Sequence, residues 1–202
     1  MKKIICIAIV AAATGAIWLL WPQPAPLLPT AGTSVIVFGD SLAAGVGATA
    51  NHDIASLLRQ TLNQSVLNLG VPGDTTADGL ARIDSLLQAN PRVVIILLGG
   101  NDALRKIPTN ETFNNLDQII RKIQAAGAAV ILVGEPGGFF GNQYEKEYER
   151  LATTHRTFYI SNILSGLLGR SEYMSDLIHP NDAGYEIATG RILVELQKAL
   201  EH

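Results

Sequence analysis

The sequence predicts an α/β domain in which helices cover both faces of a parallel β-sheet. Short apolar segments rich in β-branched residues alternate with longer segments whose apolar residues recur at helical spacing. Residues 93–98 are apolar at every position, which is typical of a central strand buried on both faces. Helices of this length between strands return the chain to the same edge of the sheet, so the strands are expected to run parallel.

Each element has its own signal in the sequence. The expected strands are the apolar runs at 34–38, 66–69, 93–98, 130–133 and 158–160. The expected helices are the periodic segments at 52–62, 76–88, 112–126, 144–154 and 181–200. Asn90-Pro91 ends the second helix, and Gly127 stands just past the third, at the usual position of a helix C-cap.

The first residues of the chain differ from the rest. Lys2 and Lys3 precede an apolar run over residues 4–21, which as a helix would span about 27 Å, close to the roughly 30 Å of a bilayer's hydrocarbon core. Trp18 and Trp21 end the run, where indole rings favour the membrane interface. Because both lysines precede the run, the N-terminus is expected in the cytoplasm and the domain outside.

We favour an uncleaved membrane anchor over residues 1–21. A removed signal peptide is the alternative, and a buried first helix of the domain is a third interpretation. The nearest cleavage site, Ala13-Thr14-Gly15-Ala16, is followed by more hydrophobic residues up to Trp21. Residues 22–33 are rich in proline and are expected to form a semi-rigid extended linker to one domain over residues 34–202.

Charge and cysteine content argue against two classes of protein. The 202 residues carry a net charge of −3, and 16% of them are charged, whereas a nucleic-acid-binding protein usually carries a basic stripe. The single cysteine, Cys6, excludes an intrachain disulfide. Nothing in the sequence requires an oligomer, and we expect a monomer.

Four short motifs, far apart in the chain, together supply the groups that acyl transfer needs. Alone, a serine after a strand is most often a helix cap, and neither the nucleophile elbow of the α/β-hydrolases nor a Walker-type phosphate loop is present. The combination is more specific, because it supplies a nucleophile, hydrogen-bond donors and a base with its carboxylate. The motifs are Gly39-Asp40-Ser41-Leu42, Gly73-Asp74-Thr75, Gly99-Gly100-Asn101-Asp102 and Asp176-Leu177-Ile178-His179-Pro180.

The spacing of Asp176 and His179 favours a catalytic role for Ser41. One loop can present the two side chains to each other, so that the carboxylate accepts the Nδ1 proton and Nε2 is left to take the proton of Ser41. The amide of Asn101 could donate to a developing oxyanion. The structural alternatives are a surface loop in which Asn181 caps the last helix, and an ordinary turn asparagine. Ligands of such sheets bind beyond the carboxyl ends of the strands, where these motifs are expected to meet.

The four motifs closely resemble the SGNH hydrolases, the GDSL family of esterases and lipases. The family is named for a serine, a glycine, an asparagine and a histidine, which correspond here to Ser41, Gly73, Asn101 and His179. Within the family, residues 71–82 and 98–105 resemble the bacterial thioesterase I, lysophospholipase L1 and arylesterase branch. The resemblance covers about residues 34–200.

The resemblance implies a flavodoxin-like three-layer α/β/α sandwich with a five-stranded parallel sheet. It implies Ser41 as the nucleophile, His179 as general base and then acid, and Asp176 as the group that orients His179. The implied oxyanion hole consists of the backbone N–H groups of Ser41 and Gly73 and the side-chain amide of Asn101. No metal or cofactor is implied. With the N-terminal segment, the expected location is the bacterial periplasm or cell exterior, with residues 4–21 in the inner membrane.

A glycine-rich segment, residues 135–142, follows the fourth expected strand and contains two aromatic residues. Its place over the strand ends makes Phe139 and Phe140 candidate walls for an acyl chain, and packing of both rings into the core is the alternative. The aspartates that flank the motif residues are expected to shape loops through hydrogen bonds to the backbone. These are Asp40, Asp74 and Asp102.

Three functions are consistent with the sequence. The leading hypothesis is a carboxylic ester hydrolase that acts on acyl esters, with thioesters and lysophospholipids as further substrates. The same machinery would serve a carbohydrate O-acetylesterase or acetyltransferase of the cell envelope. A membrane-tethered binding domain without activity is the third hypothesis, although every catalytic position holds a competent residue.

Overall fold

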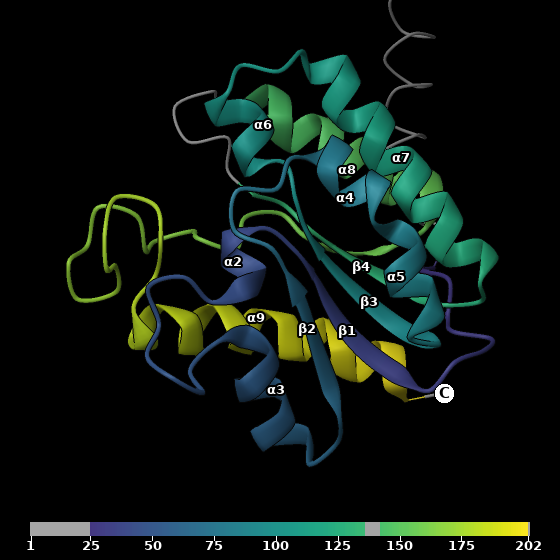
Figure 1. Cartoon of the computed structure of the whole chain (residues 1–202), viewed down its shortest axis with the longest axis horizontal. Coiled ribbons are helices and arrows are strands. Elements are labelled where there is room, and N and C mark those ends of the chain that lie inside the picture. Colours follow the sequence, from purple (N-terminus) through teal and green to yellow (C-terminus); the bar gives the residue numbers. More distant parts are fainter. Residues whose placement is uncertain (1–24, 136–141, 202) are drawn as a thin grey trace, which may run out of the picture.

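The computed structural model describes residues 25–135 and 142–201. Its centre is a five-stranded, wholly parallel sheet with the strand order β2-β1-β3-β4-β5 (Figure 1). The strands are β1 (Ser34–Gly39), β2 (Val66–Gly70), β3 (Pro91–Leu97), β4 (Ala129–Val133) and β5 (Phe158–Ile160). The helices are α2 (Ser41–Ala44), α3 (Ile54–Leu62), α4 (Thr76–Ala81), α5 (Ile83–Gln88), α6 (Gly100–Leu104), α7 (Thr109–Ala125), α8 (Asn142–His155) and α9 (Asp182–Leu200).

Helices cover both faces of the sheet, and each face has its own hydrophobic layer. Successive residues of a strand point to opposite faces. In β3, Val93 and Ile95 therefore pack with α3 and α9, whereas Val94 and Ile96 pack with α5, α7 and α8. All four side chains are fully buried. Figure 1 shows the same division, with α3 and α9 on one side of the sheet and α7 and α8 on the other. The predicted three-layer sandwich is confirmed.

The helix expected over residues 76–88 is divided in two, and this part of the prediction was wrong. The chain leaves α-helical geometry at Arg82, which ends α4 and precedes α5. The guanidinium of Arg82 lies at the carboxyl ends of β1 and β2, where it donates to the carbonyl oxygens of Leu69 (2.8 Å) and Gly39 (2.9 Å). These tertiary hydrogen bonds fix the position of Arg82, and helical periodicity in the sequence gives no sign of them.

Two short helices at the carboxyl edge of the sheet, α2 and α6, were not predicted. Each is only four or five residues long, too short for a helical period to show in the sequence. The Asp40 side chain caps α2 by accepting a hydrogen bond from the backbone N–H of Leu42 at 3.0 Å. Both helices begin two or three residues beyond the end of a strand, so their first residues lie at the edge where ligands of parallel sheets bind.

The described part of the proline-rich segment lies along the opposite, amino-terminal edge of the sheet. Leu27 N–H donates to the carbonyl of Arg156 at 2.7 Å, and Thr30 N–H donates to that of Gly127 at 2.8 Å. Both acceptors come just before a strand, so residues 27–30 cross the edge remote from the four motifs. None of the helices in the two described ranges is both long and apolar enough to span a bilayer. The apolar run predicted as an anchor, residues 4–21, lies outside the described residues.

Candidate active site

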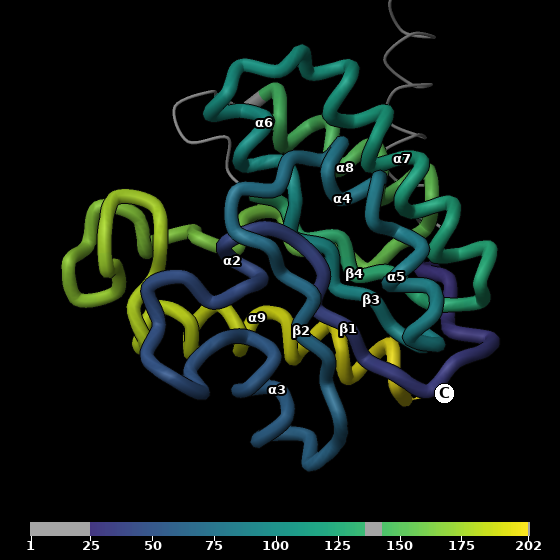
Figure 2. Tube along the Cα trace, viewed as in Figure 1, coloured from purple at the N-terminus to yellow at the C-terminus, as the bar shows by residue number. Residues whose placement is uncertain are grey.

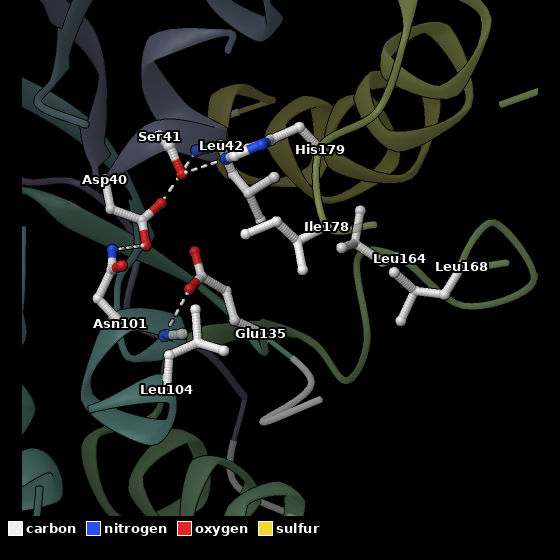
Figure 3. A pocket seen from close by; sticks show the side chains of 11 residues that line it. Asp40, Ser41, Leu42, Asn101, Leu104, Glu135, Leu164, Leu168, Ile178 and His179 are labelled. Carbon is white, nitrogen blue, oxygen red and sulfur yellow. Dashed lines mark hydrogen bonds between the residues drawn. The ribbon is translucent and has the colours of Figure 1, made fainter. Parts of the chain in front are cut away.

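Ser41 is the first residue of α2, two positions after the end of β1, and its hydroxyl faces the edge of the sheet. The side chain of His179 reaches it from a different part of the chain. Ser41 Oγ and His179 Nε2 are 3.0 Å apart, which is hydrogen-bonding distance (Figure 3). Residues separated by 138 positions in sequence thus meet at one hydroxyl group.

The loop that carries His179 is held in a tight reversal. Residues 161–181, between β5 and α9, extend beyond the carboxyl edge of the sheet and return to α2 (Figure 2). Within this loop Met174 pairs with Pro180 in an antiparallel bridge, and Ser175 N–H donates to the His179 carbonyl at 2.9 Å. These backbone hydrogen bonds fix the direction of the imidazole before any substrate binds.

Asp176 holds the other side of the imidazole. Its Oδ2 is 2.7 Å from His179 Nδ1, and its Oδ1 accepts the backbone N–H groups of Ile178 and His179, each at 2.8 Å. The hydrogen bond from His179 is the largest of the influences that lower the pKa of Asp176, to about 2. An ionised Asp176 requires a proton on Nδ1, so Nε2 faces Ser41 as an acceptor.

Asn101, the second residue of α6, lies on the other side of Ser41. Its Nδ2 donates to Asp40 Oδ2 and to the Asp74 carbonyl, each at 3.0 Å. The hydrogen bond to the Asp74 carbonyl connects Asn101 to the loop that contains Gly73. The backbone φ of Gly73 is +89°, a value that favours glycine. Among the described residues, the backbone N–H groups of Ser41 and Gly73 have no hydrogen-bond acceptor. These two donors are therefore available to a ligand.

The aspartates flanking the motifs were expected to bond to the backbone, and the structure bears this out for two of them. Asp40 accepts from Leu42 N–H, and Asp102 accepts from Thr76 N–H at 2.8 Å. Asp74 instead forms an ion pair with Arg82, with Oδ2 and Nε 2.6 Å apart. The hydrogen bond that the Asn101 side chain donates to Asp40 was not predicted.

A cleft open to solvent lies in front of Ser41, Asn101 and His179. Its walls are largely apolar, and some of these side chains remain exposed, Leu104 at 54%. Sequence reasoning missed these residues, because they come from separate loops and carry no motif. The apolar wall consists of Leu42, Leu104, Leu164, Leu168 and Ile178 (Figure 3). Phe139 and Phe140, predicted as walls of this site, lie outside the described residues.

The structure adds one further residue, Glu135, to the floor of the cleft. It follows β4 by two positions, and only 3% of it is exposed. Its Oε2 accepts the Gly100 N–H at 2.8 Å. Burial, with the neighbouring Asp40 charge, raises the pKa of Glu135 well above its usual value. The signal in the sequence was a lone acidic residue shortly after an apolar strand, at the edge where the motifs meet.

In the two described ranges, no group of three or more His, Cys, Asp or Glu residues has the geometry of a metal site.

Comparison with known proteins agrees with this geometry. Residues 37–187 match the model of the GDSL-like lipase/acylhydrolase family. The chain belongs to this family. Esterase TesA of Pseudomonas aeruginosa is 33% identical over 162 residues, which is 74% of this chain and 81% of that protein. The thioesterase 1/protease 1/lysophospholipase L1 of Escherichia coli K12 is 30% identical over 181 residues, 85% of this chain and 87% of that protein.

A solved structure is similar at the level of the fold and of the sequence. The psychrotrophic esterase EstA from Pseudoalteromonas, determined with monoethylphosphonate as inhibitor, superposes with a TM-score of 0.73 at 28% identity. The alignment covers 84% of this chain and 99% of that one. The predicted family membership is thus confirmed, and the chain is an enzyme of the acylhydrolase type.

Proposed function

We propose that this protein is a serine carboxylic ester hydrolase that cleaves acyl esters through an acyl-enzyme on Ser41. The observation that carries the proposal is the continuous line of hydrogen bonds from Asp176 through His179 to Ser41, at 2.7 and 3.0 Å. A nucleophile, a base and a group that orients the base are the parts that covalent acyl transfer requires. The names of the relatives, esterase and thioesterase, support the same reaction class.

In the first half of the reaction, Ser41 Oγ attacks the ester carbonyl carbon while His179 Nε2 takes the hydroxyl proton. The carbonyl oxygen becomes an oxyanion, and we assign its stabilisation to the N–H groups of Ser41 and Gly73 and the amide of Asn101. As the intermediate collapses, the C–O bond to the leaving group breaks and His179 returns the proton to the departing alcohol. Asp176 stabilises the imidazolium present between these two proton transfers.

In the second half, water replaces the alcohol. His179 Nε2 takes a proton from water as its oxygen attacks the acyl carbon, and the same donors stabilise the second oxyanion. When the acyl–Oγ bond breaks, Ser41 regains its proton from His179 and the carboxylic acid leaves. The side chains of this cycle return to their starting protonation states, and no other reactant is required.

The apolar wall of the cleft supports acyl chains longer than acetyl. Leu104, Leu168 and Ile178 present exposed hydrocarbon beside the nucleophile, and an acyl chain that covers them removes apolar surface from water. Phe139 and Phe140 remain proposed members of the same wall. The competing hypothesis, a carbohydrate O-acetylesterase, predicts no turnover of octanoyl esters. Thioesters and lysophospholipids, the substrates in the name of the Escherichia coli relative, are the first natural classes to assay.

We further propose that residues 4–21 hold the enzyme at the outer side of the inner membrane. The apolar run, the preceding lysines and the two tryptophans support this location. Residues 27–30 lie at the amino edge of the sheet, so a tether there leaves the cleft at the opposite edge accessible. Sequencing the N-terminus of the mature protein distinguishes the anchor from a removed signal peptide.

Replacement of the nucleophile tests the proposal. In the Ser41→Ala variant we expect no turnover of p-nitrophenyl butyrate and no labelling by a fluorophosphonate probe, with an unchanged circular dichroism spectrum. The matched control is Ser165→Ala, which removes an exposed hydroxyl from the loop between β5 and α9 and is expected to behave like the wild type. Hydrolysis by Ser41→Ala at the wild-type rate would refute the assignment.

A further inference from the structure

Two buried carboxyl groups lie side by side under the proposed oxyanion hole, and the reaction described above uses neither of them. Asp40 precedes the nucleophile, and Glu135 follows β4, on the other side of β3. Each is only 3% exposed. Figure 3 shows the two carboxyl groups facing each other across the floor of the cleft. Ionising both carboxyl groups would cost much free energy, because buried charges of like sign repel strongly.

Each carboxyl group accepts a hydrogen bond from one of two successive residues in the turn at Gly100 and Asn101. Gly100 N–H donates to Glu135 Oε2 at 2.8 Å, and the amide of the next residue, Asn101, donates to Asp40 Oδ2 at 3.0 Å. A Cβ atom at Gly100 would lie 2.6 Å from Glu135 Oε2 and 3.8 Å from Asp40 Oδ2, so both inner oxygens lie against this glycine. The pair thus positions the turn that carries Asn101.

The hydrogen-bond partners of the two carboxyl groups favour a proton on Glu135. Both oxygens of Asp40 already accept N–H groups, from Leu42 and Asn101. Glu135 Oε1 is buried and, among the described residues, meets no N–H or O–H donor. The two carboxyl groups lie side by side, and a proton on one of them would allow a hydrogen bond between them. A proton on Glu135 satisfies its second oxygen and supplies that bond.

Charges around the pair favour the same assignment. No lysine or arginine of the described chain forms an ion pair with either carboxyl group. The groups facing Glu135 are Asp40, Asp102 from α6 and Tyr148 from α8, and both aspartates disfavour a negative charge on it. Burial, with a smaller contribution from Asp74, raises the pKa of Asp40 to about 6, whereas the Leu42 N–H and the nearby His179 favour its charge. Tyr185 from α9 faces both carboxyl groups. One proton on Glu135 leaves the pair with a single negative charge.

This charge matters for Asn101, whose two amide hydrogens both have acceptors in the resting enzyme, Asp40 Oδ2 and the Asp74 carbonyl. An oxyanion must compete for one of these hydrogens. A full carboxylate would hold it with a charge-assisted hydrogen bond, roughly twice as strong as a neutral one. A proton that Glu135 shares with Asp40 reduces the negative charge on Asp40 and so weakens the hydrogen bond from Asn101 to Asp40.

We propose that Glu135 is a positioning residue of the oxyanion hole, a neutral carboxylic acid that donates its proton to Asp40 while anchoring the backbone of Gly100. The inference rests on the proposed function, because it concerns the same site. It predicts that an amide can replace the acid. In Glu135→Gln the side-chain oxygen still accepts from Gly100 N–H and the amide N–H donates to Asp40, whereas Glu135→Ala loses both interactions.

Steady-state kinetics with p-nitrophenyl butyrate separate these variants. We expect kcat of Glu135→Gln within about threefold of the wild type, and kcat of Glu135→Ala lower by about 10- to 100-fold with KM little changed, as for loss of a supporting partner of a catalytic group. The matched control is Glu186→Gln, which removes an exposed carboxylate from α9 and is expected to have no effect. Equal losses in the Gln and Ala variants, or no loss in Glu135→Ala, would overturn the inference.

The pH profile gives a second readout. Wild-type kcat is expected to fall at alkaline pH as Glu135 loses its proton, and Glu135→Gln is expected to lack this fall. The same alkaline fall in both enzymes would contradict the role of Glu135. Because this comparison uses only the isosteric variant, it still decides the matter if Glu135→Ala does not fold.

An infrared difference spectrum, wild type minus Glu135→Gln, provides a readout independent of turnover. At neutral pH we expect the carbonyl stretch of a protonated carboxylic acid in the wild type only. A difference confined to carboxylate bands would overturn the inference. Failure of the proposed function would instead appear as wild-type hydrolysis that does not depend on Ser41, so the two failures are distinguishable.

Discussion

Replacement of Asp176 by asparagine is expected to damage the enzyme more than replacement by alanine. The asparagine oxygen can keep the backbone N–H groups of Ile178 and His179, which now bond to Oδ1 at 2.8 Å. Its NH₂ group then occupies the place of Oδ2, 2.7 Å from His179 Nδ1. A donor there favours the tautomer with the proton on Nε2. That nitrogen then cannot accept the proton of Ser41.

The structure sets the size of the two effects. The fall in the pKa of Asp176 from 3.8 to about 2 corresponds to roughly 2.5 kcal/mol before solvent screening. Because 53% of the Asp176 side chain is exposed, solvent screening leaves about 1 kcal/mol, which is shared between the His179 ring and two backbone N–H groups and corresponds to no more than about fivefold in rate. With the loss of orientation, we expect kcat of Asp176→Ala to fall by about 10²-fold. The wrong tautomer in Asp176→Asn raises the loss to about 10³- to 10⁴-fold.

Single-turnover and steady-state rates with p-nitrophenyl butyrate measure this order. Circular dichroism spectra should match the wild type for both variants, because Asp176 lies at the surface. Asp84→Asn, which changes an exposed aspartate of α5, is the matched control and should retain full activity. An asparagine variant as active as the alanine variant would refute the tautomer argument.

Four further predictions concern other parts of the molecule. Asn101→Ala should lower kcat by about 10²- to 10³-fold with little change in KM, as for loss of one oxyanion donor, and an equal rise in KM would argue against that role. Arg82→Ala should lower the free energy of unfolding in urea by about 3 kcal/mol, since a half-buried guanidinium leaves two carbonyls and a carboxylate without their donor, and a loss below 1 kcal/mol would contradict this estimate. The double variant Leu104→Ala and Leu168→Ala should reduce kcat/KM for octanoyl esters more than for acetyl esters, and equal losses on both would count against an acyl-chain wall. Burial raises the pKa of Glu135 in the folded state, so the native protein binds more protons than the unfolded chain, and wild-type stability should fall as pH rises above the ordinary range of a glutamate carboxyl. Glu135→Gln should show a smaller fall, and parallel curves would be evidence against a buried acid.

The local sequence was sufficient for the order and type of most elements. Period-2 and period-3.6 patterns depend only on which residues are apolar, and the runs at 93–98 and 130–133 correspond closely to β3 and β4. The motifs were likewise recognisable, because each follows a strand within a few residues and carries its reactive side chain in a short, distinctive stretch. The family assignment followed from these motifs in their order.

Other features depend on contacts between distant residues, which no local pattern encodes. The helix division at Arg82 results from its hydrogen bonds to the ends of β1 and β2. The apolar wall is assembled from single leucines on α6 and on the loop after β5. The sequence marks Glu135 only as an acidic residue after an apolar strand, and the strand order is what places its carboxyl group beside Asp40.

The sequence by itself determined the fold class and the identity of the reacting groups, since both follow from residue type and short-range spacing. The tertiary structure alone decided which donors face which acceptors, how exposed each group is and therefore which carboxyl groups are charged. Protonation depends on desolvation and on neighbouring charges, and both are fixed only when strands and loops from different parts of the chain pack together.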